Sequence, residues 1–340
     1  MNSIYKENIT GGAGMSYVLL MVGFIFLIKG ADYFVEGAST IAEKLKVPSI
    51  LIGLTIVAFG TSAPELAVSI KSGLSASGDI AAGNVLGSNI FNILLVIGAV
   101  AIIKPIKIEK GLILKEFPLL LLSAFVPLVL FADVALEGAT SNVLSRGNGI
   151  ILITIFCIYM YYVIETGLKS RNIGDDVAVE IDSQVDVEKE SKGIGKEIIL
   201  GIVGLLGVIV GGDLVVESSK TIAMSLGMSE ALVGLTIVAV GTSLPELVTS
   251  IVAATKGDSD MAVGNVIGSN IFNSLLILGT TSLISPVNIE SKMIVDAAFV
   301  LMVSLIVYVF AVSRRKVTKV EGILLAVTYV GYMVYIIGRN

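Results

Sequence analysis

The chain has 340 residues, of which 55% are hydrophobic and only 15% charged, and its mean hydropathy is +0.93. A soluble domain carries about 25% charged residues, so this composition excludes an ordinary soluble protein and indicates a polytopic membrane protein. The absence of histidine and the presence of one cysteine, Cys157, exclude histidine zinc sites, a Ser-His-Asp triad and disulfides. The net charge of −5 gives no reason to expect nucleic acid as a partner.

Apolar stretches near the roughly 18 to 20 residues that cross a bilayer recur along the chain. Because the stretches are this long, helices are favoured over strands, and we predict an all-α fold. Residues 1–14 lack the apolar region of a cleaved secretory signal. The ten predicted transmembrane helices cover residues 16–35, 47–73, 80–103, 112–131, 149–168, 196–216, 228–255, 261–284, 293–312 and 320–337.

The longest polar interval, residues 169–195, divides the chain into two sets of five predicted helices, 1–168 and 196–340. Lysine and arginine are enriched in cytoplasmic loops. If loops are assigned alternately to the two sides, 16 basic residues fall on the side of this linker and six on the other. We therefore expect a multi-pass protein of the cell membrane, with both termini outside and the acidic linker in the cytoplasm.

The two halves resemble each other. Shifting the sequence by 181 residues aligns residues 30–98 with 211–279 without a gap, and 37 of the 69 positions are identical. Since each half has an odd number of predicted helices, the second must enter the membrane from the opposite side. Inverted repeats of this kind are typical of secondary transporters, whose substrates bind near the midplane on interrupted helices.

Each half contains a proline and a glutamate within an apolar helix, in "GTSAPEL" at 60–66 and "GTSLPEL" at 241–247. The proline removes one helical hydrogen bond and should kink or break the helix, freeing carbonyl oxygens near residues 58–60 and 239–241. A carboxylate inside a membrane costs at least ~2.5 kcal/mol and marks a functional site by default. The hydroxyls three and four residues earlier share its helical face. These candidate residues are Glu65, Thr61 and Ser62, with Glu246, Thr242 and Ser243.

The third predicted helix of each half repeats "GNVxGSNIFN", at 83–92 and 264–273. Its serine and final asparagine lie four residues apart and share one helical face: Ser88 with Asn92, and Ser269 with Asn273. The combined candidate ligands are all oxygen donors, which suits Ca²⁺ better than soft metals. Two buried carboxylates balance one Ca²⁺ or two Na⁺, and without an ion they repel each other. Such a site should change sides only when its charge is compensated, which favours ion exchange over leakage.

These motifs resemble those of the sodium/calcium exchanger family of calcium:cation antiporters, in alpha motifs at residues 53–98 and 234–279. The resemblance implies exchange of Na⁺ for Ca²⁺ by alternating access, with the first and sixth helices sliding across the others. It implies no cofactor, no enzymatic activity and no obligatory protein partner. The cation ligands that it implies are Glu65, Glu246, Thr61, Ser62, Thr242, Ser243, Ser88, Asn92, Ser269 and Asn273, with the carbonyls of Ala58 and Ala239.

Asn273 departs from the family pattern, because many sodium/calcium exchangers have aspartate and potassium-dependent relatives have an acidic residue there. Asparagine argues against dependence on K⁺ and leaves the Na⁺ to Ca²⁺ ratio open. The main alternative function is Ca²⁺/H⁺ exchange, and the others are an uncoupled cation channel and an intramembrane aspartyl protease.

Further acidic residues recur in both halves. For Asp32 and its equivalent Asp213 we expect an interfacial position or a pairing with Lys29 rather than a role in transport. Asp79 and Asp260 precede apolar helices and are predicted to cap their N-termini.

Overall fold

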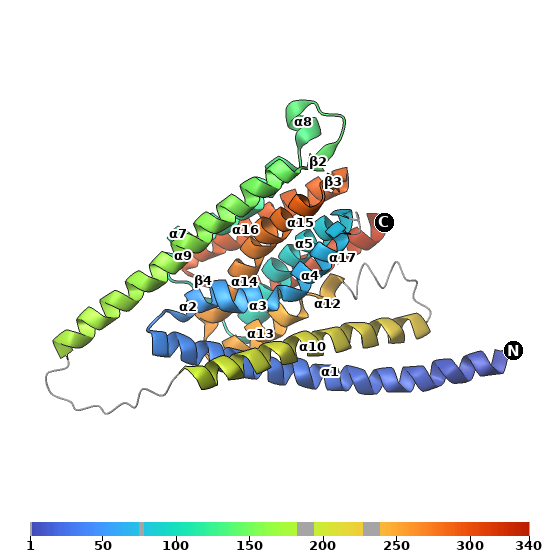
Figure 1. Cartoon of the computed structure of the whole chain (residues 1–340), viewed down its shortest axis with the longest axis horizontal. Coiled ribbons are helices and arrows are strands. Elements are labelled where there is room, and N and C mark those ends of the chain that lie inside the picture. Colours follow the sequence, from blue (N-terminus) through green and yellow to red (C-terminus); the bar gives the residue numbers. More distant parts are fainter. Residues whose placement is uncertain (1, 75–77, 182–193, 227–238, 340) are drawn as a thin grey trace.

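The protein is described by a computed structural model that covers residues 2–74, 78–181, 194–226 and 239–339 (Figure 1). Helices dominate it. Up to the central linker the elements are α1 (Asn2–Leu45), α2 (Ser49–Ile52), the π-helix η1 (Gly53–Val57), α3 (Ala58–Thr61), α4 (Ala63–Leu74), α5 (Gly78–Phe91), the π-helix η2 (Asn92–Val96), α6 (Ile97–Ile103), β1 (Ile106–Lys107), α7 (Lys110–Leu130), α8 (Asp133–Glu137), β2 (Asn142–Leu144) and α9 (Arg146–Ile181).

The remaining elements follow the linker, of which residues 182–193 lie outside the described part. They are α10 (Gly195–Ser225), α12 (Ala239–Gly241), α13 (Leu244–Thr255), α14 (Ser259–Ile271), the π-helix η4 (Phe272–Ile277), α15 (Leu278–Ile284), β3 (Val287–Ile289), α16 (Ser291–Arg314), β4 (Lys316–Val317) and α17 (Lys319–Arg339). The helix α9 continues beyond the predicted end of its span and into the linker, as far as Ile181.

Eight described helices are long and apolar enough to cross a membrane, and the bent pair Ser49–Thr61 and Ala63–Leu74 makes a ninth if it counts as one span. The predicted span 228–255 is described only from residue 239, and it contains the shorter apolar helix Leu244–Thr255. The structure is therefore that of a mostly helical polytopic membrane protein, and the count of ten helices stays a prediction.

The spans that carry the repeated "GNVxGSNIFN" motif occupy the centre of the bundle. Within an 18-residue apolar stretch of each span, 94% is buried in Ser259–Ile284 and 72% in Ile80–Ile103, whereas at most 44% is buried in the other six unbroken spans. Outer helices such as α9 expose large apolar side chains, including Ile158 and Tyr161. Because these side chains match the hydrocarbon of a bilayer, the polar motifs lie in protein while the apolar surface faces lipid.

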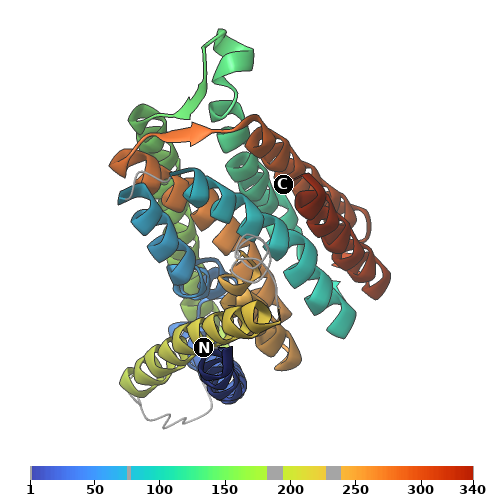
Figure 2. The ribbon, with the colours of Figure 1, turned by 90° about the vertical axis from the view of Figure 1, so that its right-hand side faces the viewer.

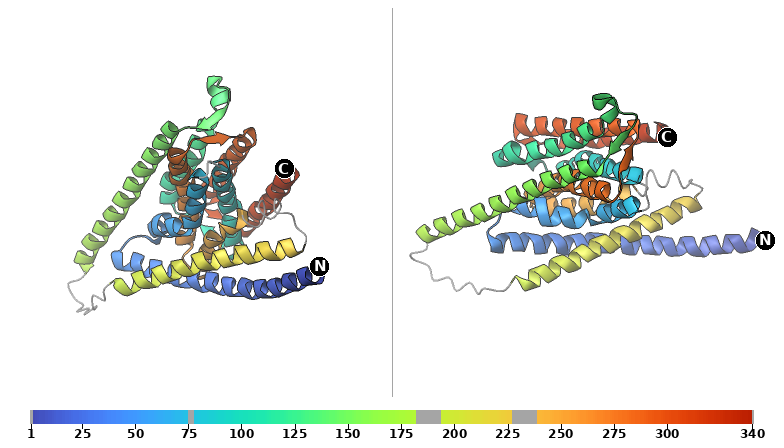
Figure 3. Two further views of the ribbon diagram at one scale, coloured as in Figure 1. Left: turned by 45° about the vertical axis from the view of Figure 1, so that its right-hand side comes forward. Right: turned by 45° about the horizontal axis from the view of Figure 1, so that its top comes forward.

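Helices α1 and α10 lie side by side along one edge of the bundle, at the bottom of Figure 1 and in both views of Figure 3. Glycines allow this contact. A Cβ atom at Gly207 would lie 3.0 Å from the Cα of Gly30, and one at Gly30 would lie 2.8 Å from the carbonyl oxygen of Gly204. The helices thus meet backbone to backbone, as small residues permit in membranes.

Two short antiparallel strand pairs connect loops that are distant in sequence. Strand β1 pairs with β4 through Ile106 opposite Val317, and β2 pairs with β3 through Val143 opposite Asn288. Figure 2 shows β2 and β3 at one end of the bundle. Each pair joins a loop before the linker to a loop after it.

Candidate cation-binding site

The broken helix of the first half turns at Ser62. Its segments Ser49–Thr61 and Ala63–Leu74 meet at 48°, and Ser62 has φ −82° and ψ 6°. Ser243 has nearly the same geometry, with φ −93° and ψ 6°, immediately before α13. These angles lie in the sparsely populated bridge region, where many active-site residues are found. The predicted break is confirmed, and the two "TS-x-PE" motifs form turns of the same geometry.

Proline acts here by starting a new helix rather than by bending an existing one. Pro64 lies in the first turn of α4 and Pro245 in the first turn of α13. Backbone amides in the first turn make no hydrogen bond within the helix, so proline costs none there.

The expectation that the turn frees the carbonyl of Ala58 is wrong, because this oxygen accepts the amide N–H of Ser62 at 3.0 Å. The same oxygen lies 3.4 Å from the hydroxyl of Thr61, whose hydrogen has nearer acceptors at 3.1 Å, so the second lone pair of Ala58 can still face a cation. Ala239 begins α12.

The carboxylate of Glu65, on α4, is surrounded by hydroxyls. It is completely buried. Its Oε1 atom lies 3.1 Å from Oγ of Ser243 and 3.4 Å from Oγ of Ser88, and these two hydroxyl oxygens are 2.9 Å apart. Ser88 belongs to the same half as Glu65, whereas Ser243 comes from the turn of the other half.

Glu246, on α13, has the reciprocal arrangement. It is also completely buried, and its Oε1 accepts the hydroxyl of Ser62 at 2.9 Å. Ser269, the repeat equivalent of Ser88, lies close to this carboxylate. Each half therefore contributes its glutamate to one site and its turn serine to the glutamate of the other half.

The turn threonines contact two asparagines that the sequence analysis did not select. Thr61 donates to Oδ1 of Asn265 at 3.1 Å, and Thr242 lies 3.4 Å from Oδ1 of Asn84. The carbonyl oxygen of Val57, in the same helix, lies equally close at 3.1 Å, so it competes with Asn265 for the single hydroxyl hydrogen of Thr61. Asn84 and Asn265 are identical at the 181-residue shift, so the repeat itself was the signal that could have found them.

Asn92 and Asn273 lie at two π-helices, at the start of η2 and within η4. Both are fully buried. Among the described residues, neither atom of either amide has a hydrogen-bond partner, and Oε2 of each glutamate and Oγ of Ser269 also lack one. Buried polar groups without partners cost free energy, and single π-turns occur frequently at functional sites. The site thus offers carboxylate, amide and hydroxyl oxygens that a hard cation can bind.

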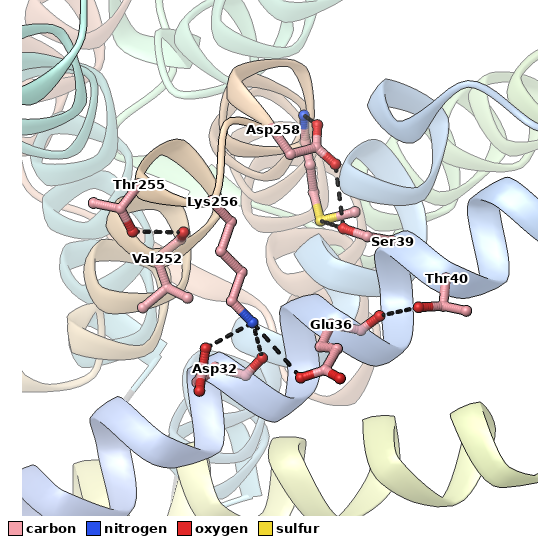
Figure 4. A network of polar contacts seen from close by, with 9 residues as sticks. Asp32, Glu36, Ser39, Thr40, Val252, Thr255, Lys256 and Asp258 are labelled. Atoms are coloured by element: carbon pink, nitrogen blue, oxygen red, sulfur yellow. Dashed lines mark hydrogen bonds and ion pairs between the residues drawn. The ribbon is translucent and has the colours of Figure 1, made fainter.

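The remaining acidic residues correct the expected cap at Asp260 and one of the two alternatives for Asp32, the pairing with Lys29 (Figure 4). Asp32 of α1 forms its ion pair with Lys256, at 2.6 Å, rather than with Lys29. The N-terminus of α14 is capped by Asp258, which accepts from the amide of Met261, so the expected cap Asp260 lies in the first turn instead. Asp258 also accepts from Ser49 at 2.8 Å. The side chain of Asp79 lies outside the described residues.

A cavity of about 500 Å³ lies beside the turn of the second half. It lies between α4, α10 and the start of α13, and its lining includes Pro64, Asp213, Thr242 and Pro245. Asp213 is the repeat equivalent of Asp32. One of the two equivalent acidic positions therefore lines an open cavity, while the other is held in an ion pair.

The chain matches the family model described as sodium/calcium exchanger protein over residues 15–165 and 196–338. It is 38% identical to the protein CaxA of Alkalimonas amylolytica, over 93% of this chain and 96% of that protein. It is 34% identical to the sodium/calcium exchanger MaX1 of Methanosarcina acetivorans, over 94% of this chain and 98% of the relative.

A solved structure has the same fold. The sodium-calcium exchanger NCX_Mj, soaked with 10 mM Na⁺ and no Ca²⁺, matches with a TM-score of 0.80 and 33% identity, over 95% of this chain and 99% of that one. Together with the family match, this similarity shows that the chain belongs to the sodium/calcium exchanger protein family.

Proposed function

We propose that this protein is a secondary active antiporter, not an enzyme, which exchanges Na⁺ for Ca²⁺ across the cell membrane by alternating access. The observation that carries the proposal is the pair of fully buried glutamates, Glu65 and Glu246, each of which accepts a hydroxyl from the turn of the other half. The relatives named sodium/calcium exchangers support it.

The charge of the site sets what it can carry. Two carboxylates balance one Ca²⁺ or two Na⁺, and with neither ion bound they repel each other in a medium of low dielectric constant. We therefore expect the empty site rarely to change access from one side of the membrane to the other, so that ions are exchanged rather than leaked. Asn273 is uncharged, and we propose exchange that is independent of K⁺ and that extrudes Ca²⁺ down the Na⁺ gradient.

We propose the predicted ligand set as the binding residues, in an inverted repeat of ten transmembrane helices. The substrates are Ca²⁺ and Na⁺. The protein acts within the lipid bilayer and needs no cofactor and no protein partner. The proposed ligands are Glu65, Glu246, Thr61, Ser62, Thr242, Ser243, Ser88, Asn92, Ser269 and Asn273, with the carbonyls of Ala58 and Ala239.

The test is Ca²⁺ uptake into proteoliposomes of the purified protein. Vesicles loaded with Na⁺ should take up Ca²⁺ when diluted into medium without Na⁺, whereas choline-loaded vesicles should not, and K⁺ on either side should change nothing. Uptake that needs only a pH gradient would favour the rival Ca²⁺/H⁺ exchange. Ca²⁺ flux without any counter-ion would indicate a channel instead.

A further inference from the structure

Two equivalent pairs of polar residues have different hydrogen bonds. Asn265 and Ser250 correspond to Asn84 and Ser69 at the 181-residue shift. Nδ2 of Asn265 donates to Oγ of Ser250 at 2.9 Å. Among the described residues, Nδ2 of Asn84 and Oγ of Ser69 are both buried without a partner. The asparagine and serine are thus hydrogen-bonded in the second half and not in the first.

The open pair lies beside the cavity. Thr242, which contacts Asn84, lines the cavity of about 500 Å³, and so does Val68, the neighbour of Ser69. The closed pair lies behind packed side chains, because Val248, on the same helix as Ser250, packs against Leu27, Ala31 and Val208 of α1 and α10. Thr61, which contacts Asn265, is completely buried.

The half with the formed bond is also tied to α1, beside a cavity of about 400 Å³ lined by Glu36 and Lys256. Lys256 lies six residues after Ser250. It forms ion pairs with two residues of α1, Asp32 at 2.6 Å and Glu36 at 3.9 Å (Figure 4). The equivalent of Asp32 in the other half, Asp213, lines the open cavity. The hydrogen-bond difference and the difference in access therefore occur together.

We infer that these two Asn-Ser pairs form a reciprocal switch that is coupled to the side on which the site is open. Asn265 holds Ser250 in the state seen here. When the cavity closes and the opposite side opens, Asn84 binds Ser69 and Asn265 releases Ser250. Each asparagine also accepts the turn threonine of the other half, so the change reaches the turns beside Glu65 and Glu246. This inference rests on the proposed alternating access, and it assigns positioning roles to four residues outside the proposed ligand set.

The test uses two matched reporters of access, in a Cys157→Ser background that removes the natural thiol. Ala67→Cys reports on the observed cavity, which Ala67 lines. Val248→Cys is its repeat equivalent and packs here against a cluster of α1 and α10 residues. The measurement is the rate at which a membrane-impermeant thiol reagent modifies each cysteine, in proteoliposomes permeabilised so that the reagent reaches both faces.

Ser250→Ala removes the bond of the observed state, so labelling of Ala67→Cys should fall and labelling of Val248→Cys should rise. Ser69→Ala removes the bond of the other state and should shift both rates in the opposite directions. We expect shifts of roughly 2- to 10-fold, the effect of one net hydrogen bond. The control is Ser72→Ala on the same helix as Ser69, because the Ser72 hydroxyl bonds to the carbonyl of Val68 in its own helix.

The switch is refuted if the two serine variants change a reporter in the same direction, or if neither differs from Ser72→Ala. Because the readout needs no ion exchange, it is independent of the uptake assay. Opposite shifts without Na⁺-driven uptake would support the switch and refute Na⁺ coupling. Na⁺-driven uptake without opposite shifts would refute the switch alone.

Discussion

Glu65 and Glu246 each depend on the opposite half of the chain for a hydrogen bond. Ser243 approaches Glu65 at 3.1 Å, and Ser62 donates to Glu246 at 2.9 Å. Neither half could therefore build its carboxylate site alone. This crossing predicts that both motifs are needed, because each supplies the charge of one position and the hydroxyl of the other.

Replacing either glutamate by glutamine should abolish exchange while the protein still inserts and folds. One carboxylate cannot neutralise Ca²⁺, and breaking a buried charge contact costs ~3–5 kcal/mol, so we expect a loss of at least about 100-fold. The measurement is Na⁺-driven uptake of radiolabelled Ca²⁺ by Glu65→Gln and Glu246→Gln.

The chain offers a matched control in Glu116→Gln. Glu116 is a buried glutamate on α7 that accepts the hydroxyl of Tyr162 at 3.1 Å, and it belongs to no proposed ligand set. This variant should keep exchange within a few-fold of the unmodified protein. Normal exchange by either site variant would remove Glu65 and Glu246 from the mechanism.

At the scale of single residues, the sequence led to the buried carboxylates and to the serines that surround them. It did not lead to Asn84 and Asn265, because their contacts with the threonines cross between halves and depend on tertiary packing. The carbonyl of Ala58 was wrongly expected to be free. Proline predicts which amide is missing, but whether the helix bends or restarts depends on the turn, and the restart at Ala63 leaves Ala58 bonded to Ser62.

At the scale of elements, the broken helix was predictable and the π-helices were not. A proline inside an apolar run has few structural outcomes. A π-turn requires only that one hydrogen bond shift along the helix, and no residue type announces it. The structure places η2 at Asn92 and η4 around Asn273, so this unpredicted element shapes the part of the site that the asparagines occupy.

The contact between α1 and α10 should not tolerate a side chain at Gly30. A Cβ atom there would lie 2.7 Å from the carbonyl carbon of Gly207, and backbone cannot move aside as a flexible side chain can. Gly30→Ala should separate the two helices and lower the free energy of unfolding by ~1–3 kcal/mol. It should also slow exchange, because the proposed exchange requires these two helices to slide across the others. The measurements are the thermal unfolding midpoint of the purified protein and the rate of Na⁺-driven uptake.

Gly331→Ala is the matched control for this substitution. Gly331 is exposed on α17, and a Cβ atom there would meet nothing within 4 Å in the described part of the chain. It should not lower the unfolding midpoint, since alanine favours a helix over glycine, and it should leave the uptake rate unchanged. Equal effects of the two variants would mean that lost glycine flexibility, rather than the helix contact, is responsible.

At the scale of the whole molecule, the strand pairs indicate which loops lie on the same side of the membrane. In the predicted arrangement, the loops at 104–111 and 313–319 lie on one side and those at 132–148 and 285–292 on the other. The observed pairs β1 with β4 and β2 with β3 each join loops that share a side in this arrangement. The hydrogen bonds agree with the predicted threading without indicating which side is the cytoplasm.

The distribution of basic residues supplies that orientation and leads to a prediction. Glu137, exposed on α8, and Val185, in the acidic linker, are separated by one predicted span, so cysteines there should lie on opposite sides. Since the linker side carries 16 of the 23 basic residues, it should be cytoplasmic. In intact cells and a Cys157→Ser background, a membrane-impermeant maleimide should label Glu137→Cys and spare Val185→Cys until the cells are permeabilised. Labelling of Val185→Cys alone would reverse the orientation, and labelling of both would contradict the predicted number of spans between them.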